Sequence, residues 1–132
     1  MRRLVVVLGL TALVAGCGDS ADDSGVTQSF RHEVARLKQR TTPAGAISHV
    51  TAEPAARSGT ADAAWRLDSQ LPWPEFSSWA RRRLGSEFDV DTSMARVLKG
   101  ARASATDIYY ITLAPDALDS GVVLVHLTAL PR

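Results

Sequence analysis

The chain has 132 residues, 45% of them hydrophobic, which is long enough for one domain of modest core size. Its 15 basic and 14 acidic side chains give a formal net charge of +1. A general nucleic-acid binder carries a strong basic excess, so this balance argues against that class, and no nucleic acid is expected as a partner.

The amino-terminal segment has the three-part layout of a secretory signal. Arg2 and Arg3 precede an almost wholly apolar run over residues 4–14, and two small residues, Ala15 and Gly16, come next. This layout predicts export. A permanent transmembrane helix needs roughly 20 apolar residues, so a cleaved signal is the better interpretation of this shorter run.

The signal ends in the quartet Val14, Ala15, Gly16 and Cys17, which resembles the lipobox of bacterial lipoproteins. The resemblance implies that a dedicated signal peptidase recognises the first three residues and cuts before Cys17. The thiol then carries a diacylglyceryl group, and acyl chains such as palmitate anchor the mature protein, each buried methylene contributing about 0.8 kcal/mol. The alternatives are a buried Cys17 in an uncleaved helix or a spare thiol in an ordinary secreted protein.

Lipid anchoring would place the chain at the cell membrane or the outer membrane, facing the periplasm or the cell exterior. In Gram-negative lipoproteins an aspartate directly after the cysteine favours the inner membrane, whereas here Gly18 takes that position and Asp19 follows it. Cys17 is the only cysteine, so no disulfide is expected and stability in the oxidising envelope depends on packing.

Residues 18–25 are small, polar and acidic, which predicts a flexible tether. The predicted organisation is therefore a signal peptide at 1–16, a lipidated tether at 17–25 and one domain at 26–132. A metal-binding interpretation of the tether aspartates is disfavoured because ordering such a segment costs conformational entropy.

The domain begins with a predicted helix over residues 26–40. Val26, Phe30, Val34 and Leu37 recur at helical spacing and form one apolar stripe. Glu33 and Arg36, three positions apart, are placed for a surface ion pair. The stripe packs on the domain in one interpretation, and in the other the helix spans solvent and meets a partner.

Period-two patterns predict strands over residues 46–53 and 61–71, joined by a connection at 54–60 that is longer than a tight hairpin turn. In the second strand the core side is predicted to hold Ala63, Trp65, Leu67 and Leu71.

A second helix opens at Pro72 and is stopped by Gly85. Three further strands are predicted over 93–100, 106–113 and 121–130. This α-β-β-α-β-β-β order predicts a small α+β domain, with an antiparallel sheet of about five strands and two helices packed on one face.

Two chemical motifs are present in the sequence only in part. His32 and Glu33 start a zinc-protease pattern, but Arg36 stands where the second histidine is required. The acidic stretch at 89–93 starts like a calcium loop, but Met94 replaces the required glycine. No catalytic residue, metal site or cofactor is therefore predicted.

Three other groups of residues are candidates for binding, each with a structural alternative. The aromatic residues could line a groove for a peptide or glycan or could form the core of the domain. The run of arginines at 81–83 could contact lipid phosphates or an acidic partner, or could be a solvated helix side. His49, within a predicted strand, is interpreted as a core-edge or solvent-facing residue. The four aromatics are Trp65, Trp73, Phe76 and Trp79.

The leading functional prediction is a non-catalytic, lipid-anchored module that binds an envelope protein or a cell-wall component. The alternative is a small lipid-anchored hydrolase or ligand carrier, with a site assembled in three dimensions from His126, Asp107 and Tyr109 or from the aromatic residues. A mechanical linker that acts through its first helix is a third possibility.

The lipobox resemblance predicts that the wild-type chain incorporates a fatty-acid analogue in cells and that Cys17→Ala does not. Gel fluorescence of the labelled protein measures this. Equal incorporation by the two proteins would refute anchoring through Cys17.

Overall fold

The computed structural model describes residues 25–132. The predicted signal peptide, the predicted lipidation site Cys17 and the predicted tether up to residue 24 lie outside the described residues. Among the residues that are described, no helix is both long enough and apolar enough to cross a bilayer.

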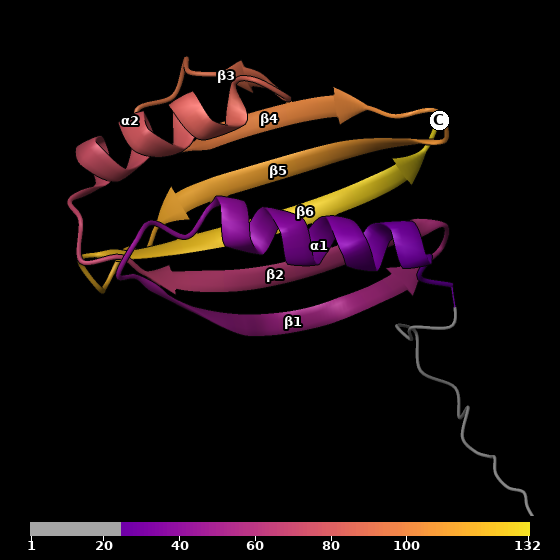
Figure 1. The fold of residues 1–132 in the computed structure, drawn as a ribbon, viewed down its shortest axis with the longest axis horizontal. Coiled ribbons are helices and arrows are strands. Elements are labelled where there is room, and N and C mark those ends of the chain that lie inside the picture. Colours follow the sequence, from indigo (N-terminus) through magenta and orange to yellow (C-terminus); the bar gives the residue numbers. More distant parts are fainter. Residues whose placement is uncertain (1–24) are drawn as a thin grey trace, which may run out of the picture.

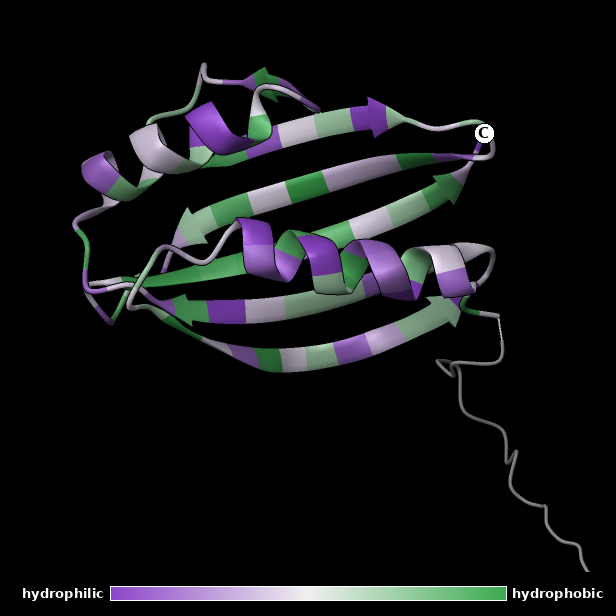
Figure 2. Cartoon of the chain, viewed as in Figure 1, coloured by the Kyte–Doolittle hydropathy of each residue, from purple (hydrophilic) through white to green (hydrophobic). Residues whose placement is uncertain are grey.

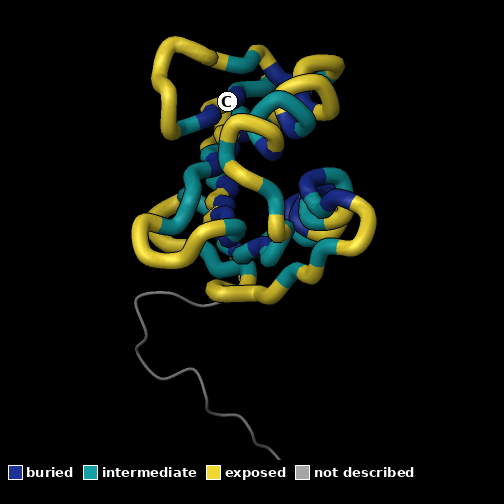
Figure 3. Tube along the Cα trace, turned by 90° about the vertical axis from the view of Figure 1, so that its left-hand side faces the viewer, coloured by how far each residue is buried: buried dark blue, intermediate teal, exposed yellow. Residues whose placement is uncertain are grey.

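The described chain forms two helices and a six-stranded, wholly antiparallel sheet with strand order β1-β2-β6-β5-β4-β3. Both helices lie on the same side of the sheet (Figures 1 and 3). This confirms the predicted α+β class, with six strands where about five were expected. The elements are α1 (Gln28–Arg40), β1 (Ile47–Arg57), β2 (Thr60–Asp68), α2 (Trp73–Leu84), β3 (Asp89–Asp91), β4 (Leu98–Ala103), β5 (Asp107–Pro115) and β6 (Val122–Pro131).

Helix α1 is set by its cap and its apolar stripe. The Thr27 hydroxyl accepts a 3.0 Å hydrogen bond from the backbone N–H of Phe30, which satisfies one of the free donors of the first turn. Phe30, Val34 and Leu37 are buried in the core. The stripe therefore packs on the sheet, which counts against a linker helix that stands clear of the domain.

The β1–β2 hairpin differs from the prediction. Strand β1 continues to Arg57, so Ser58 and Gly59 form a tight two-residue turn, with φ values of 54° and 82°. The expected longer connection is wrong because β1 absorbs Pro54 through two irregularities in its pairing with β2, at Val50/Ala52 and Ala52/Ala55.

The strand predicted over 93–100 is also displaced. The chain instead forms the short β3 at Asp89–Asp91 and then β4 at Leu98–Ala103. Between them the carboxylate of Asp91 accepts a 2.9 Å hydrogen bond from the backbone N–H of Ser93, a local turn that ends β3.

Helix α2 begins with proline in its first turn and ends at Gly85, as predicted. The N–H of Gly85 donates to the Arg81 carbonyl at 2.9 Å. A Cβ at this position would lie 2.9 Å from the same carbonyl oxygen, so the stop requires glycine. Phe76, Ala80 and Leu84 are buried.

The core lies between the helices and one face of the sheet, which we call the covered face. Apolar and polar residues alternate along the strands (Figure 2), and one register row across β2, β6, β5 and β4 consists of Trp65, Val125, Leu113 and Leu98. Trp65 is 1% exposed, and its indole N–H donates to Thr41 at the end of α1 at 3.2 Å. Through Trp65 the row ties the sheet to α1.

If α1 is part of this core, Leu37→Ala should lower the free energy of unfolding by about 2–5 kcal/mol, because it opens a cavity at a fully buried position. Gln39→Ala, on the exposed side of the same helix, should change it by less than about 0.5 kcal/mol. Urea unfolding measures both. Similar effects for the two variants would contradict this packing.

Candidate functional site

The four aromatic residues predicted as binding candidates lie in two separate places in the structure. Trp73, Phe76 and Trp79 lie together on α2, with ring centroids 6.0 Å apart for the first pair and 5.7 Å for the second. Trp65 lies on β2 and bonds to the end of α1. Phe76 and Trp65 are buried, and Trp73 donates its indole N–H to the Ala95 carbonyl at 2.8 Å. These rings thus mainly pack the domain.

The residues of the hydrolase alternative do not meet. His126 lies on the sheet face opposite the helices, where its Nε2 is 2.9 Å from the carboxylate of Asp62. Tyr109 is on the covered face, 5% exposed, and burial raises the pKa of its phenol. Since the sheet separates His126 from Tyr109, these side chains do not form one catalytic arrangement.

The other candidate residues are dispersed. His32 is exposed on α1 and His49 on β1. Within residues 25–132 no group of three or more potential metal ligands gathers. In the arginine run, Arg83 lies over the Trp79 ring at 5.4 Å and donates to the Arg40 carbonyl at 3.0 Å, so it joins the two helices.

A network of charged side chains lies where α1, β4 and the segment after α2 meet. Arg36 donates to Glu33 and to Glu87, each at 2.5 Å. Arg40 reaches Glu87 at 2.7 Å, and Arg102 bonds to both carboxylates. The predicted Glu33–Arg36 pair is confirmed. It belongs to a larger set that sequence spacing could not show, because Arg102 is 69 positions from Glu33.

Aromatic rings hold Arg102 in this network. Its guanidinium lies 5.0 Å from the Phe88 ring centroid and 4.9 Å from that of Tyr109. The hydrogen bonds from Arg36 hold the pKa of Glu87 below its usual range, and the nearby charges of Arg36, Arg40 and Arg102 act in the same direction. The network therefore fixes α1 against the rest of the fold.

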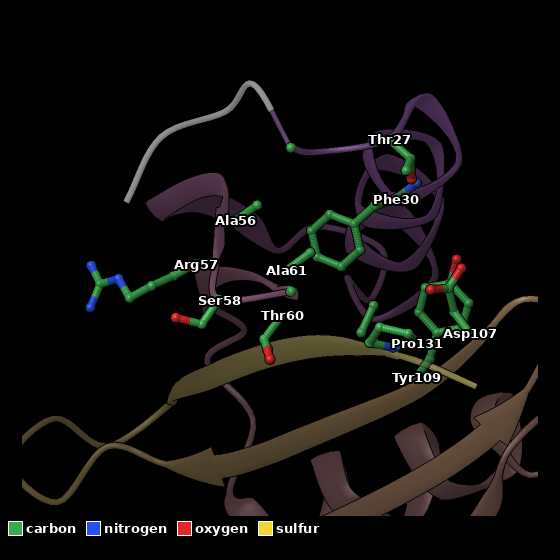
Figure 4. A pocket seen from close by; sticks show the side chains of 13 residues that line it. Thr27, Phe30, Ala56, Arg57, Ser58, Thr60, Ala61, Asp107, Tyr109 and Pro131 are labelled. Carbon is green, nitrogen blue, oxygen red and sulfur yellow. The ribbon is translucent and has the colours of Figure 1, made fainter. Parts of the chain in front are cut away.

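A cavity of about 410 Å³ opens at the end of the sheet where the chain enters the domain (Figure 4). The ring of Phe30 lies between the β1–β2 hairpin on one side and Asp107, Tyr109 and Pro131 on the other, while Arg57 extends away from it. Gly25, the first described residue, also lines the cavity. The mixed lining could hold a small amphipathic molecule.

The remaining candidate is the face of the sheet opposite the helices, which we call the uncovered face. On its two central strands, Tyr110 is 43% exposed, Leu124 44% and Leu130 37%. The strands that flank this central pair place charged side chains there, including Arg66 on β2 and Lys99 on β4. This face was not among the sites predicted from the sequence, although the alternation of side chains along β5 and β6 indicates which of their residues lie on it.

Comparison with protein-family models, with curated proteins and with solved structures finds no match for the chain.

The charged network predicts a pH dependence. In the folded state the pKa of Glu87 is below its ordinary value of 4.5. The ionised Glu87 therefore stabilises the fold fully at a pH above 4.5, and this stabilisation is lost as the pH falls through the lowered pKa. Glu87→Gln should therefore destabilise the domain by about 1–2 kcal/mol at pH 7, and by much less at about pH 2.

Thermal unfolding of wild type and Glu87→Gln at both pH values measures the difference in stability between them. Glu53→Gln, at an exposed carboxylate on β1, serves as the control and should show little effect at either pH. If the stability difference between wild type and Glu87→Gln stays constant or increases in acid, this would count against the network.

Proposed function

We propose that this chain is a lipid-anchored protein of the cell envelope whose domain is a non-catalytic module that binds an envelope protein. The signal and lipobox pattern ending at Cys17 supports the anchoring. In this proposal the lipid holds the domain at the membrane, and the tether lets it reach a partner there.

The observation that carries the binding role is the arrangement of the uncovered face. Its exposed apolar side chains, Tyr110, Leu124 and Leu130, lie on the central strands β5 and β6. Its charged side chains lie mainly on the strands to either side, such as Arg66 and Lys99. The polar residues His126 and Thr128 lie between Leu124 and Leu130 on β6, so the face mixes aromatic, aliphatic and polar side chains. Protein interfaces are enriched in aromatic residues and combine them with polar groups, so a protein partner is favoured over a cell-wall glycan.

The cavity beside Phe30 supports a second candidate, a carrier of small amphipathic ligands. Its volume of about 410 Å³ is within the range of about 300–1,000 Å³ typical of ligand pockets. The two candidates differ in location, since the cavity lies at one end of the sheet on the helix side and the proposed interface lies on the other face.

In-cell photocrosslinking tests the proposed interface. A photoreactive phenylalanine analogue replaces Tyr110 in one protein and Gln39, exposed on α1, in the matched control. The analogue at 110 should give one crosslinked protein in stoichiometric amount, and the analogue at 39 should give about tenfold less, since most binding energy comes from the centre of an interface.

Both proteins are purified from native membranes before the crosslinks are compared. Equal crosslinking from the two positions, or recovery of the chain alone from both, would overturn the proposed interface. Recovery of the chain alone, together with a co-purified small molecule, would favour the carrier.

A further inference from the structure

Two cavities adjoin at the end of the sheet where the chain enters the domain. The cavity beside Phe30 has a volume of about 410 Å³, and a second cavity, lined mainly by polar residues, has about 510 Å³. Tyr109 lines both cavities. The lining also passes from one cavity to the other between consecutive residues, at 27–28 and at 106–107. One ligand can therefore extend from the first cavity into the second around Tyr109.

The cavity beside Phe30 suits an apolar chain. Its apolar walls come from Phe30, Ala56, Ala61 and Pro131, while the charged end of Arg57 extends away from it (Figure 4). An apolar cavity of about 150 Å³ is enough to hold the six carbons of benzene. The volume of about 410 Å³ therefore has room for a chain of about a dozen carbons.

The second cavity presents side chains that both donate and accept hydrogen bonds. Gln28, Ser29 and His32 line it. They share one face at the start of α1, because His32 is three positions from Ser29 and four from Gln28. All three are exposed, and none of them bonds to another residue within the described part of the chain. An amide, a hydroxyl and a neutral imidazole match the hydroxyl groups of a sugar.

The ionisable groups around the two cavities argue against a phosphate headgroup. Arg102 lines the second cavity, but its guanidinium already bonds to Glu33 and Glu87. The carboxylate of Asp107, where the cavities adjoin, accepts a hydrogen bond from the Thr106 hydroxyl at 2.8 Å. A phosphate beside this carboxylate would be repelled, because like charges brought together are unfavourable. A sugar hydroxyl can instead donate a hydrogen bond to it.

The position of the cavities in the chain favours a ligand from the bilayer. Gly25 lines the first cavity and follows Cys17, the predicted lipidation site, by eight positions. An extended chain spans at most about 3.5 Å per residue, so Gly25 lies within about 28 Å of the predicted anchor. Membrane lipids are therefore the amphipathic molecules within reach of this site.

We infer that the adjoining cavities bind a glycolipid, with one acyl chain beside Phe30 and an uncharged sugar headgroup against Gln28, Ser29 and His32. Burial of the chain supplies affinity, and the hydrogen-bonding side chains select the headgroup. The inference rests on the carrier, the second candidate function, and on the lipid anchor. The site is separate from the uncovered face.

Photoreactive lipids test the inference in phosphatidylcholine vesicles that contain the full chain. One probe is a galactosyl diacylglycerol, and the other is a phosphatidylglycerol, which has hydroxyl groups and a negative charge. Both carry the same acyl chains, with a diazirine in one of them. The galactolipid should label the segments around Phe30 and Pro131 about tenfold more than the phosphatidylglycerol does. Mass spectrometry of the labelled peptides measures the yield and the position.

Two substitutions test the two parts of the site. Ala56→Phe fills the first cavity and should reduce galactolipid labelling by about tenfold or more. Ala55→Phe is the matched control, because it adds the same side chain on the other face of β1, outside the cavity lining, and should stay within about twofold of wild type. Asp107→Asn removes the repelling charge and should increase phosphatidylglycerol labelling several-fold.

Four outcomes would overturn the inference. They are the absence of galactolipid labelling near Phe30, equal labelling by the two probes, labelling of Ala56→Phe at the wild-type level, and labelling of Cys17→Ala but not of the lipidated chain. The last would make the protein's own acyl chain the occupant. The comparison of the two probes uses the wild-type chain, so it decides even if a variant does not fold.

None of these outcomes bears on crosslinking from position 110. The failure of this inference is therefore distinguishable from the failure of the proposed protein interface. Loss of fatty-acid incorporation at Cys17 is a third, separate measurement, which tests the anchor.

Discussion

The structure depends on burying one apolar face of a six-stranded sheet under two short helices. Trp65, Leu127 and Ile111 lie on that face and are almost fully buried. Side chains alternate between the two faces of a strand, so fixing these residues on the covered face also fixes which residues point away from the helices. A register shift of one residue would exchange the two sets. The surface available for binding is therefore a direct consequence of the core.

The two helices are joined by polar contacts at their carboxyl-terminal ends. Arg40 donates to the Arg83 carbonyl at 2.8 Å, and Arg83 donates to the Arg40 carbonyl at 3.0 Å. Isolated surface ion pairs contribute little to stability. Here the carboxylates of Glu33 and Glu87 each bond to more than one arginine, and Arg102 lies against two aromatic rings, so the arrangement acts as a network.

Sequence periodicity was sufficient where one face of an element is buried along its length. The stripe at Phe30, Val34 and Leu37 and the alternation at Trp65 and Leu67 predicted buried faces that the structure confirms. Periodicity failed where local irregularity interrupts the pattern. The second half of β1 contains Pro54 among small residues, and β3 has only three residues, too few to show a period.

The candidate sites were harder to predict than the fold, because they depend on strand order. Nothing in local spacing indicates that β6 lies between β2 and β5, and that position is what puts Leu124 and Tyr110 on the two central strands of the sheet. The aromatic residues on α2 were predicted as binding candidates because of their residue type, but they pack against the core of the domain. The informative signal was the set of exposed apolar residues on β5 and β6.

The most direct test of the account is hydroxyl-radical footprinting of the protein in its native membrane and after purification. Leu118, 96% exposed at the β5–β6 turn, is the internal reference. If a partner covers the uncovered face, Tyr110 and Leu124 are oxidised several-fold more slowly in the membrane than in the purified protein, while Leu118 is oxidised at the same rate in both. Equal oxidation of Tyr110 and Leu124 in the two samples would contradict a partner on the uncovered face.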